Sequence, residues 1–209
     1  MSTTFTADGI PTRAPKTPRS ERGPAPTRIV VSYGFWLFLL SDIILFAAFF
    51  AAYAVLAKHT AGGPTGPQLF DREHVLIETA CLLSSSFTCG MLGLAFERRH
   101  ALFTYLFGAT TFVLGAAFVA LEVSELGHLI ATDAGPQRSA FLSAFFALVG
   151  LHGLHVAVGL AWLLAMGAQV ATIGLVPLVV QRLRCFALFW HALDIVWIGV
   201  FTIVYLGAR

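Results

Sequence analysis

Long apolar runs separated by short polar breaks dominate the pattern of this chain. An α-helix rises about 1.5 Å per residue, so about 20 apolar residues cross the hydrocarbon core of a bilayer. Five runs reach that length, at residues 29–57, 75–96, 102–121, 140–165 (with a possible extension to 173) and 183–206. Lipid satisfies no backbone hydrogen bond, and the runs are too long and too uniformly apolar for barrel strands. We therefore predict an all-α fold, a polytopic membrane protein built as a five-transmembrane-helix bundle.

The breaks between the runs carry recognisable turn and cap signals. Residues 62–67 form a Gly/Pro-rich loop, and residues 97–100 form a tight charged turn. Ser139 is placed to cap the N-terminus of the fourth helix, while Gly174 followed by Pro177 is expected to close it. A loop at 174–182 is predicted to lead into the fifth span.

Residues 1–28 differ from the rest of the chain. They hold five of the nine prolines and five of the thirteen Lys and Arg residues, with almost no apolar periodicity. This composition predicts a disordered tail, followed by a five-helix transmembrane domain at 29–209. With five spans, nine Lys and Arg residues fall on the side of the tail and four on the other side. The positive-inside rule then places the N-terminus in the cytoplasm and the C-terminus outside.

The overall composition excludes several classes of protein. Hydrophobic residues make up 57% of the chain and charged residues 11%, against about 45–50% and about 25% in soluble domains. A soluble globule, a disordered chain and a disulfide-rich secreted domain are all excluded. The net charge of +2 gives no reason to expect nucleic acid as a partner. The three cysteines lie in apolar runs without a C-x-x-C pair, so we interpret them as packing residues.

Ionisable residues inside the spans are the candidate functional residues, because each costs roughly 2.5–3.5 kcal/mol on insertion scales. They are Asp42, Glu78, Glu122, Glu125, His152, His155, His191 and Asp194. Counting helical rise predicts two layers. Asp42, the histidines and Asp194 fall in the half of the membrane nearer the N-terminal tail. The three glutamates fall near the opposite edge, where we expect them to reach interfacial water.

Three interpretations of these residues remain open from the residue types alone. His152, His155, His191 and Asp194 suit a first-row metal ion. The acids and histidines also suit a proton relay. The third interpretation is structural, with polar contacts that fix helix register or meet lipid headgroups. A ladder of small residues, Gly153, Ala157 and Ala161, predicts a closely packed face on the fourth helix.

No phosphate-binding loop, dinucleotide fingerprint or C-x-x-C-H haem attachment occurs in the sequence. There is also no internal repeat of the kind that transporters show, although a proton-coupled transporter using Asp42 and Asp194 remains an alternative. Taken alone, these residues indicate a polytopic helical membrane subunit and specify no reaction.

Four motifs resemble subunit III of the haem–copper respiratory oxidases. They are YGFW at 33–36, SDIILF at 41–46, LHGLHV at 151–156 and FWHALDIVW at 189–197. Their order and spacing fit the family along the whole chain after the tail. The segments AGGPTG at 61–66 and FLSAFFALVG at 141–150 resemble the bacterial cytochrome o ubiquinol oxidases in particular.

The resemblance implies a non-catalytic accessory subunit of a terminal oxidase in the bacterial plasma membrane. In this family, subunit III binds no haem or copper, packs on subunit I, which holds these cofactors, and carries phospholipid. The complex couples quinol oxidation and oxygen reduction to proton translocation. No catalytic, cofactor or metal residue is therefore expected in this chain, and other oxidase subunits are expected partners. Subunit III of a cytochrome c oxidase, or of a nitric oxide reductase cluster, is the alternative within the family.

Overall fold

A computed structural model describes residues 27–62 and 72–207. Its helices are α1 (Thr27–Leu56), α3 (Arg72–Glu97), α4 (Ala101–Ala131), α5 (Ala140–Ile173) and α6 (Pro177–Val200), and α6 continues into the π-helix η2 (Phe201–Leu206). Five helices in this part of the chain are long and apolar enough to cross a membrane, and it contains no strand. The predicted all-α fold with five spans is confirmed. Most of the predicted tail, and positions 63–67 of the predicted Gly/Pro loop, lie outside the described residues.

The predicted signals at two helix ends are confirmed. The hydroxyl oxygen of Ser139 accepts a hydrogen bond from the backbone N–H of Leu142 at 3.2 Å, so it caps α5. Gly174 follows the last residue of α5 with φ of 74°, a conformation that only glycine adopts without strain. The charged turn also stands where the sequence places it, since α3 ends at Glu97 and α4 begins at Ala101.

Two predicted boundaries are wrong. The loop predicted at 174–182 is confined to 174–176, because Pro177 begins α6. A proline at the first helical position loses no hydrogen bond and already has a helical φ. The third span was expected to end at residue 121, yet α4 runs on to Ala131. Glu122 and Glu125 interrupt the apolar run without ending the helix, and the neighbouring helices bury Glu122 and partly cover Glu125.

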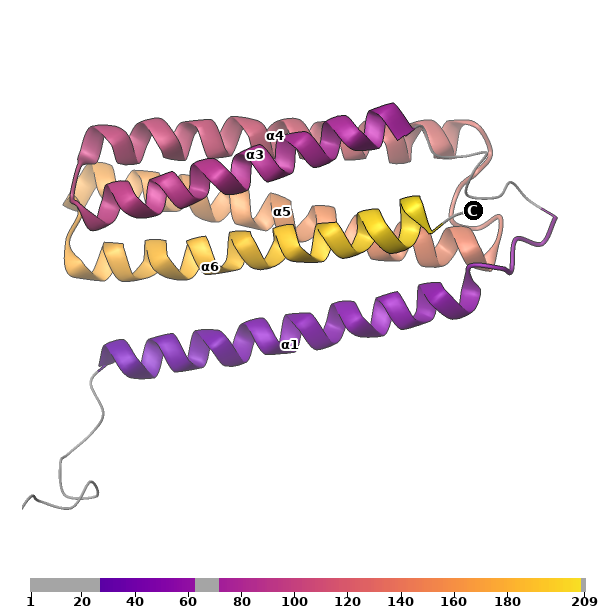
Figure 1. The fold of residues 1–209 in the computed structure, drawn as a ribbon, viewed down its shortest axis with the longest axis horizontal. Helices are drawn as coiled ribbons and strands as arrows, with labels where there is room; N and C mark the ends of the chain where they lie inside the picture. The colour runs from indigo at the N-terminus through magenta and orange to yellow at the C-terminus, as the bar shows by residue number, and fades with distance from the viewer. Residues whose placement is uncertain (1–26, 63–71, 208–209) are drawn as a thin grey trace, which may run out of the picture. The chain divides into compact units, whose positions relative to one another are not determined.

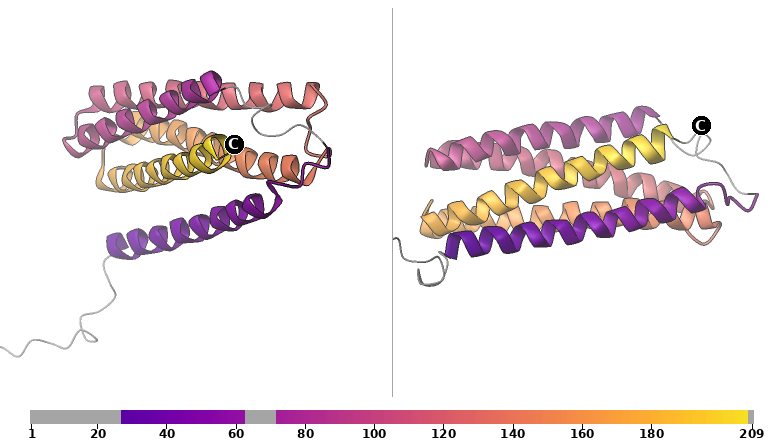
Figure 2. Two further views of the ribbon diagram at one scale, coloured as in Figure 1. Left: turned by 45° about the vertical axis from the view of Figure 1, so that its right-hand side comes forward. Right: turned by 60° about the horizontal axis from the view of Figure 1, so that its bottom comes forward.

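Contacts divide the chain after Gly34, and the described residues from Phe35 onward make up the second, compact unit. Within the second unit, α3 packs against α4 and α6, and α5 packs against the same two helices (Figures 1 and 2). The four helices thus form a closed ring in which consecutive helices are antiparallel. The part of α1 that belongs to this unit meets α5 through ring contacts. Phe35 lies 6.0 Å from Trp162, and Tyr53 lies 6.0 Å from Phe141, between ring centroids.

Large aromatic side chains fill the centre of the ring of helices. Trp190 and Trp197 of α6 are buried, as is Phe118 of α4. Trp197 and Phe118 meet edge to face with their centroids 4.7 Å apart. Glycines make room for such rings, because a helix without a Cβ atom can approach an indole closely.

The small-residue ladder predicted on α5 is only partly a packed face. Gly153 lies against the side chain of Glu122, where a Cβ atom would come within 2.5 Å of the carboxylate oxygens. Ala157 and Ala161 are exposed. The packed glycine further along α5 is Gly159, which lies against Trp190. A spacing of four residues drifts slowly around a helix of 3.6 residues per turn, so Ala161 no longer shares the face of Gly153.

Candidate functional site

Three glutamates come together between α3 and α4. Glu78 of α3 and Glu122 of α4 are buried, and Glu125 lies one turn after Glu122. All three carboxylates are within electrostatic range of one another. The hydroxyl of Tyr205 in η2 donates to Glu125 Oε2 at 3.0 Å. We call Glu78, Glu122, Glu125 and Tyr205 the acidic cluster.

Two glutamates of the acidic cluster are buried within the bundle, and Glu125 is half-buried. Glu78 is 0% exposed and Glu122 is 2% exposed, so the expectation that they reach interfacial water is wrong. None of their four carboxylate oxygens has a hydrogen-bond partner among the described residues. His74 Nε2 lies 3.4 Å from Glu78 Oε1, an ion-pair distance without hydrogen-bond alignment. The extension of α4 past residue 121 explains the burial, because it places Glu122 inside a helix that α3 and α5 flank.

The histidines and aspartates predicted to share one layer fall into two groups, with Asp194 beside His191 and Asp42 near His155. His191 of α6 faces α3, where its Nδ1 atom is 2.8 Å from the hydroxyl oxygen of Ser86. Asp194, one turn later, is half-buried, and its Oδ1 atom has no hydrogen-bond partner within the described part of the chain. Asp42 of α1 is half-buried in a small hollow lined by α1 and α6.

The two histidines of α5 lie among aromatic rings. His152 is fully buried, with its centroid 5.2 Å from Trp197 and 5.7 Å from Phe118. His155 is half-buried, and its Nδ1 atom lies 2.8 Å from the carbonyl oxygen of Leu151 in its own helix. Both rings contact Phe46 of α1, at 6.2 and 5.2 Å. The i, i+3 spacing therefore brings both histidines to α1.

Sequence reasoning missed the hydrogen bonds that join α3 to α6. Trp190 Nε1 donates to the hydroxyl oxygen of Ser85 at 2.8 Å, and Trp197 Nε1 donates to that of Thr79 at 3.1 Å. The sequence contains a signal for these bonds. Trp190 and Trp197 are seven residues apart, and their partners Ser85 and Thr79 are six residues apart on a helix that runs the other way. Buried indole N–H groups require an acceptor, which in a bundle comes from a neighbouring helix.

The arrangement of the polar residues bears on whether they could bind a metal ion. Within 27–62 and 72–207, no group of three or more His, Cys, Asp or Glu residues is arranged to hold a metal ion. His152 and His155 lie at Phe46 of α1, whereas His191 lies at Ser86 of α3, so the geometry does not favour one metal site that uses all four residues. What the side chains do provide is hydrogen bonding between helices and, at the acidic cluster, three carboxyl groups close to one another.

Five apolar helices with polar contacts sealed between them define a polytopic helical membrane protein. Residues 24–208 match the family described as cytochrome c oxidase subunit III. The chain belongs to this family, as its motifs indicate.

Similar proteins cover nearly the same length. Subunit 3 of the cytochrome bo(3) ubiquinol oxidase of Pseudomonas aeruginosa is 53% identical over 174 residues, which is 83% of each chain. Quinol oxidase subunit 3 of Bacillus subtilis is 41% identical over 173 residues, 83% of this chain and 85% of the relative. Cytochrome c oxidase subunit 3 of Alkalihalophilus pseudofirmus is 38% identical over 174 residues, 83% and 84% of the two chains.

Proposed function

We propose that this chain is the non-catalytic subunit III of a haem–copper terminal oxidase that oxidises ubiquinol. The observation that carries the proposal is the match of residues 24–208 to the family, together with relatives at 53% and 51% identity that are named ubiquinol oxidase subunit 3. The haems and the copper belong to subunit I in this proposal, and this chain contributes no ligand. Quinol oxidation, oxygen reduction and proton translocation are then activities of the whole complex.

The geometry supports a stabilising role. The hydrogen bonds Trp190–Ser85 and Trp197–Thr79 hold α6 against α3, and Thr88 on α3 bonds Thr111 on α4 at 2.9 Å. Polar side chains inside a membrane bundle fix which helix faces meet. We assign this positioning role, with contacts to phospholipid or to a neighbouring helix, to the eight ionisable residues of the spans. Apolar side chains such as Phe87 and Leu154 stay exposed and are available to lipid or to subunit I.

We propose an N-terminus in the cytoplasm and a C-terminus in the periplasm. Two of the arginines counted on the tail side, Arg99 and Arg184, lie at the same end of the bundle. Arg184 Nε lies 3.3 Å from Glu97 Oε1, and Arg99 donates to the carbonyl oxygen of Leu175 at 3.2 Å. These contacts support the positive-inside count although Arg182 and Arg184 lie in α6 rather than in a loop.

Affinity purification from native membranes tests this assignment. The chain carries a C-terminal tag, membranes are solubilised in mild detergent, and the product is examined by mass spectrometry and visible spectroscopy. We expect a complex with haem absorbance that oxidises ubiquinol with oxygen, whereas the isolated chain lacks that absorbance. Stoichiometric haem or copper on the isolated chain, or the absence of any large haem protein, would refute the proposal.

The same preparation separates the alternatives. The relative at 38% identity is named cytochrome c oxidase subunit 3, so reduced cytochrome c is the second electron donor to assay. If the complex oxidises cytochrome c and does not oxidise ubiquinol, the electron donor is cytochrome c and the assignment to the subunit III family still stands. Substrate uptake by proteoliposomes that contain this chain alone would favour a transporter.

A further inference from the structure

The acidic cluster is built where four helical elements meet. Glu78 comes from α3, Glu122 and Glu125 come from α4, and Tyr205 comes from η2. The helix α5 supplies the remaining wall at Gly153, where a Cβ atom would lie 2.5 Å from both carboxylate oxygens of Glu122. The carboxyl group of Glu122 therefore occupies a niche that a glycine on α5 provides.

No positive charge balances the two buried carboxyl groups of this cluster. Among the described side chains, no lysine or arginine lies within ion-pair distance of Glu78 or Glu122, and their four oxygens have no hydrogen-bond partner. An ionised carboxylate without a partner costs far more free energy in an apolar interior than the neutral acid does. The neutral acid also has an O–H donor, so neighbouring carboxyl groups can hydrogen-bond to each other. The geometry therefore favours the protonated form of both glutamates.

His74 connects the cluster to water. Its side chain is 31% exposed, and its Nε2 atom lies 3.4 Å from Oε1 of Glu78, whose own side chain is 0% exposed. His74 is the third residue of α3, so it lies at the end of the span, and Glu78 lies one turn further in. Imidazole takes up and releases protons near neutral pH. The pair thus joins an exposed proton carrier to a buried one.

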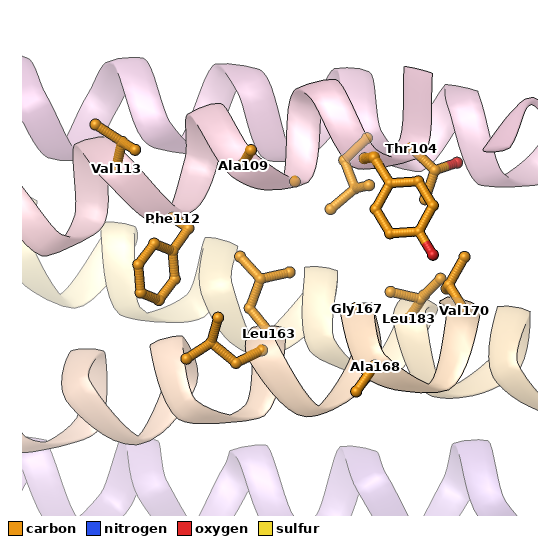
Figure 3. Close-up of a pocket in the computed structure, with 13 residues that line it drawn as sticks. Thr104, Ala109, Phe112, Val113, Leu163, Gly167, Ala168, Val170 and Leu183 are labelled. Carbon is orange, nitrogen blue, oxygen red and sulfur yellow. The ribbon is translucent and has the colours of Figure 1, made fainter. Parts of the chain in front are cut away.

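The apolar hollow of about 380 Å³ between α4 and α5 does not reach this cluster (Figure 3). On α4 its lining runs from Thr104 to Val113, and Glu122 comes nine residues later. Nine residues are about 14 Å along an α-helix. No member of the acidic cluster lines the hollow. The described contacts therefore lead from the cluster to water through His74.

We propose that the acidic cluster is a proton-binding site, with one proton on Glu78 and one on Glu122, which exchange with water through His74. The Tyr205 hydroxyl donates to Glu125 Oε2 at 3.0 Å and stabilises a negative charge on this half-buried third carboxyl group. In one exchange, Glu78 Oε1 gives its proton to Nε2 of neutral His74, and the imidazolium then gives a proton to water. Hydronium refills the site by the reverse steps. This role adds to the positioning role of the same residues and does not depend on the oxidase assignment.

Infrared spectroscopy of the purified complex tests the protonation, because a protonated carboxyl group absorbs apart from a carboxylate. Glu78→Gln and Glu122→Gln each keep the shape and neutrality of a protonated glutamate. In difference spectra against the unaltered protein, each should lose the absorbance of one protonated carboxyl group. Glu97→Gln is the matched control, because Glu97 also lies on α3 but is exposed and pairs with Arg184. It should lose only carboxylate absorbance.

Transfer of the same complex into heavy water tests the route. The bands of the protonated carboxyl groups shift when deuterium replaces the proton, and the rate of this shift is the readout. In His74→Gln the rate should fall about a hundredfold, because a positioned acid–base group contributes at least about that much to proton transfer. His128→Gln is the matched control, because His128 is exposed on α4, and it should leave the rate unchanged.

Unchanged protonated-carboxyl absorbance in either Glu78→Gln or Glu122→Gln would overturn the proposed site. Failure of both variants to give folded complex would also overturn it, because glutamine replaces a neutral glutamate without changing its shape or charge. Equal exchange rates in His74→Gln and His128→Gln would overturn the route. The haem spectrum of the same sample reports on the oxidase assignment separately.

Discussion

The indole of Trp190 is held between two glycines, which makes Gly115→Ala a sharp test of the packing. A Cβ atom at Gly115 would lie 2.8 Å from Cη2 and Cζ2 of Trp190 and 3.1 Å from Leu160 Cδ2. The ring cannot move freely away, because Gly159 lies against its Cζ3 and Cε3 atoms on the α5 side, where a Cβ atom would be 2.9 Å away. Trp190 is 1% exposed, so no open space relieves the contact.

The expected loss of unfolding free energy in Gly115→Ala is the balance of two opposing effects. Overpacking of a filled core costs about 1–3 kcal/mol. Replacing a helical glycine by alanine gains about 0.5–1 kcal/mol. The net destabilisation of Gly115→Ala is therefore between about 0 and 2.5 kcal/mol, with a midpoint of about 1 kcal/mol. At about 2–4 °C per kcal/mol for a chain of this size, the unfolding midpoint should fall by a few degrees.

The assay is thermal unfolding of the membrane-extracted protein in one detergent, with the fraction of folded chain as readout. Gly108→Ala is the control on the same helix, because a Cβ atom there is 3.9 Å from Leu92, an ordinary contact. It should be neutral or stabilising. A midpoint for Gly115→Ala at or above that of Gly108→Ala would refute the packing argument. A Trp190→Phe background should reduce the cost of Gly115→Ala, as a double-mutant cycle measures.

Three further outcomes follow from the same structure. Ser85→Ala leaves the Trp190 N–H without its acceptor and should lower the unfolding free energy by about 0.5–3 kcal/mol in thermal unfolding, whereas Ser84→Ala on the exposed side should have no effect. Ser139→Ala removes the cap of α5 at a cost of about 1 kcal/mol, and Ser139→Asp should restore the midpoint; failure of that rescue would contradict the cap. His152→Ala should leave the iron and copper content of the assembled complex unchanged in elemental analysis, and a stoichiometric drop would revive the metal interpretation.

The hydrophobic pattern was sufficient to predict five helices, because a bilayer allows little else for long apolar runs. Local signals also predicted correctly that Ser139 caps the start of α5 and that Gly174 follows its end, because capping depends on residues within one turn. The same local reasoning placed the end of the third helix too early at residue 121. It treated Glu122 as exposed to water, and only the contact with Gly153 of α5 shows that the carboxylate is enclosed.

The sequence by itself determined that the chain spans a membrane, how many times it does so, and which polar residues lie within the spans. Only the tertiary structure decided which of those residues meet. The predicted layer of histidines and aspartates divides into one group at Ser86 on α3 and one at Phe46 on α1, and the glutamates form a third group. Depth along a helix follows from counting residues, whereas the direction in which a side chain points at that depth depends on which helices pack together.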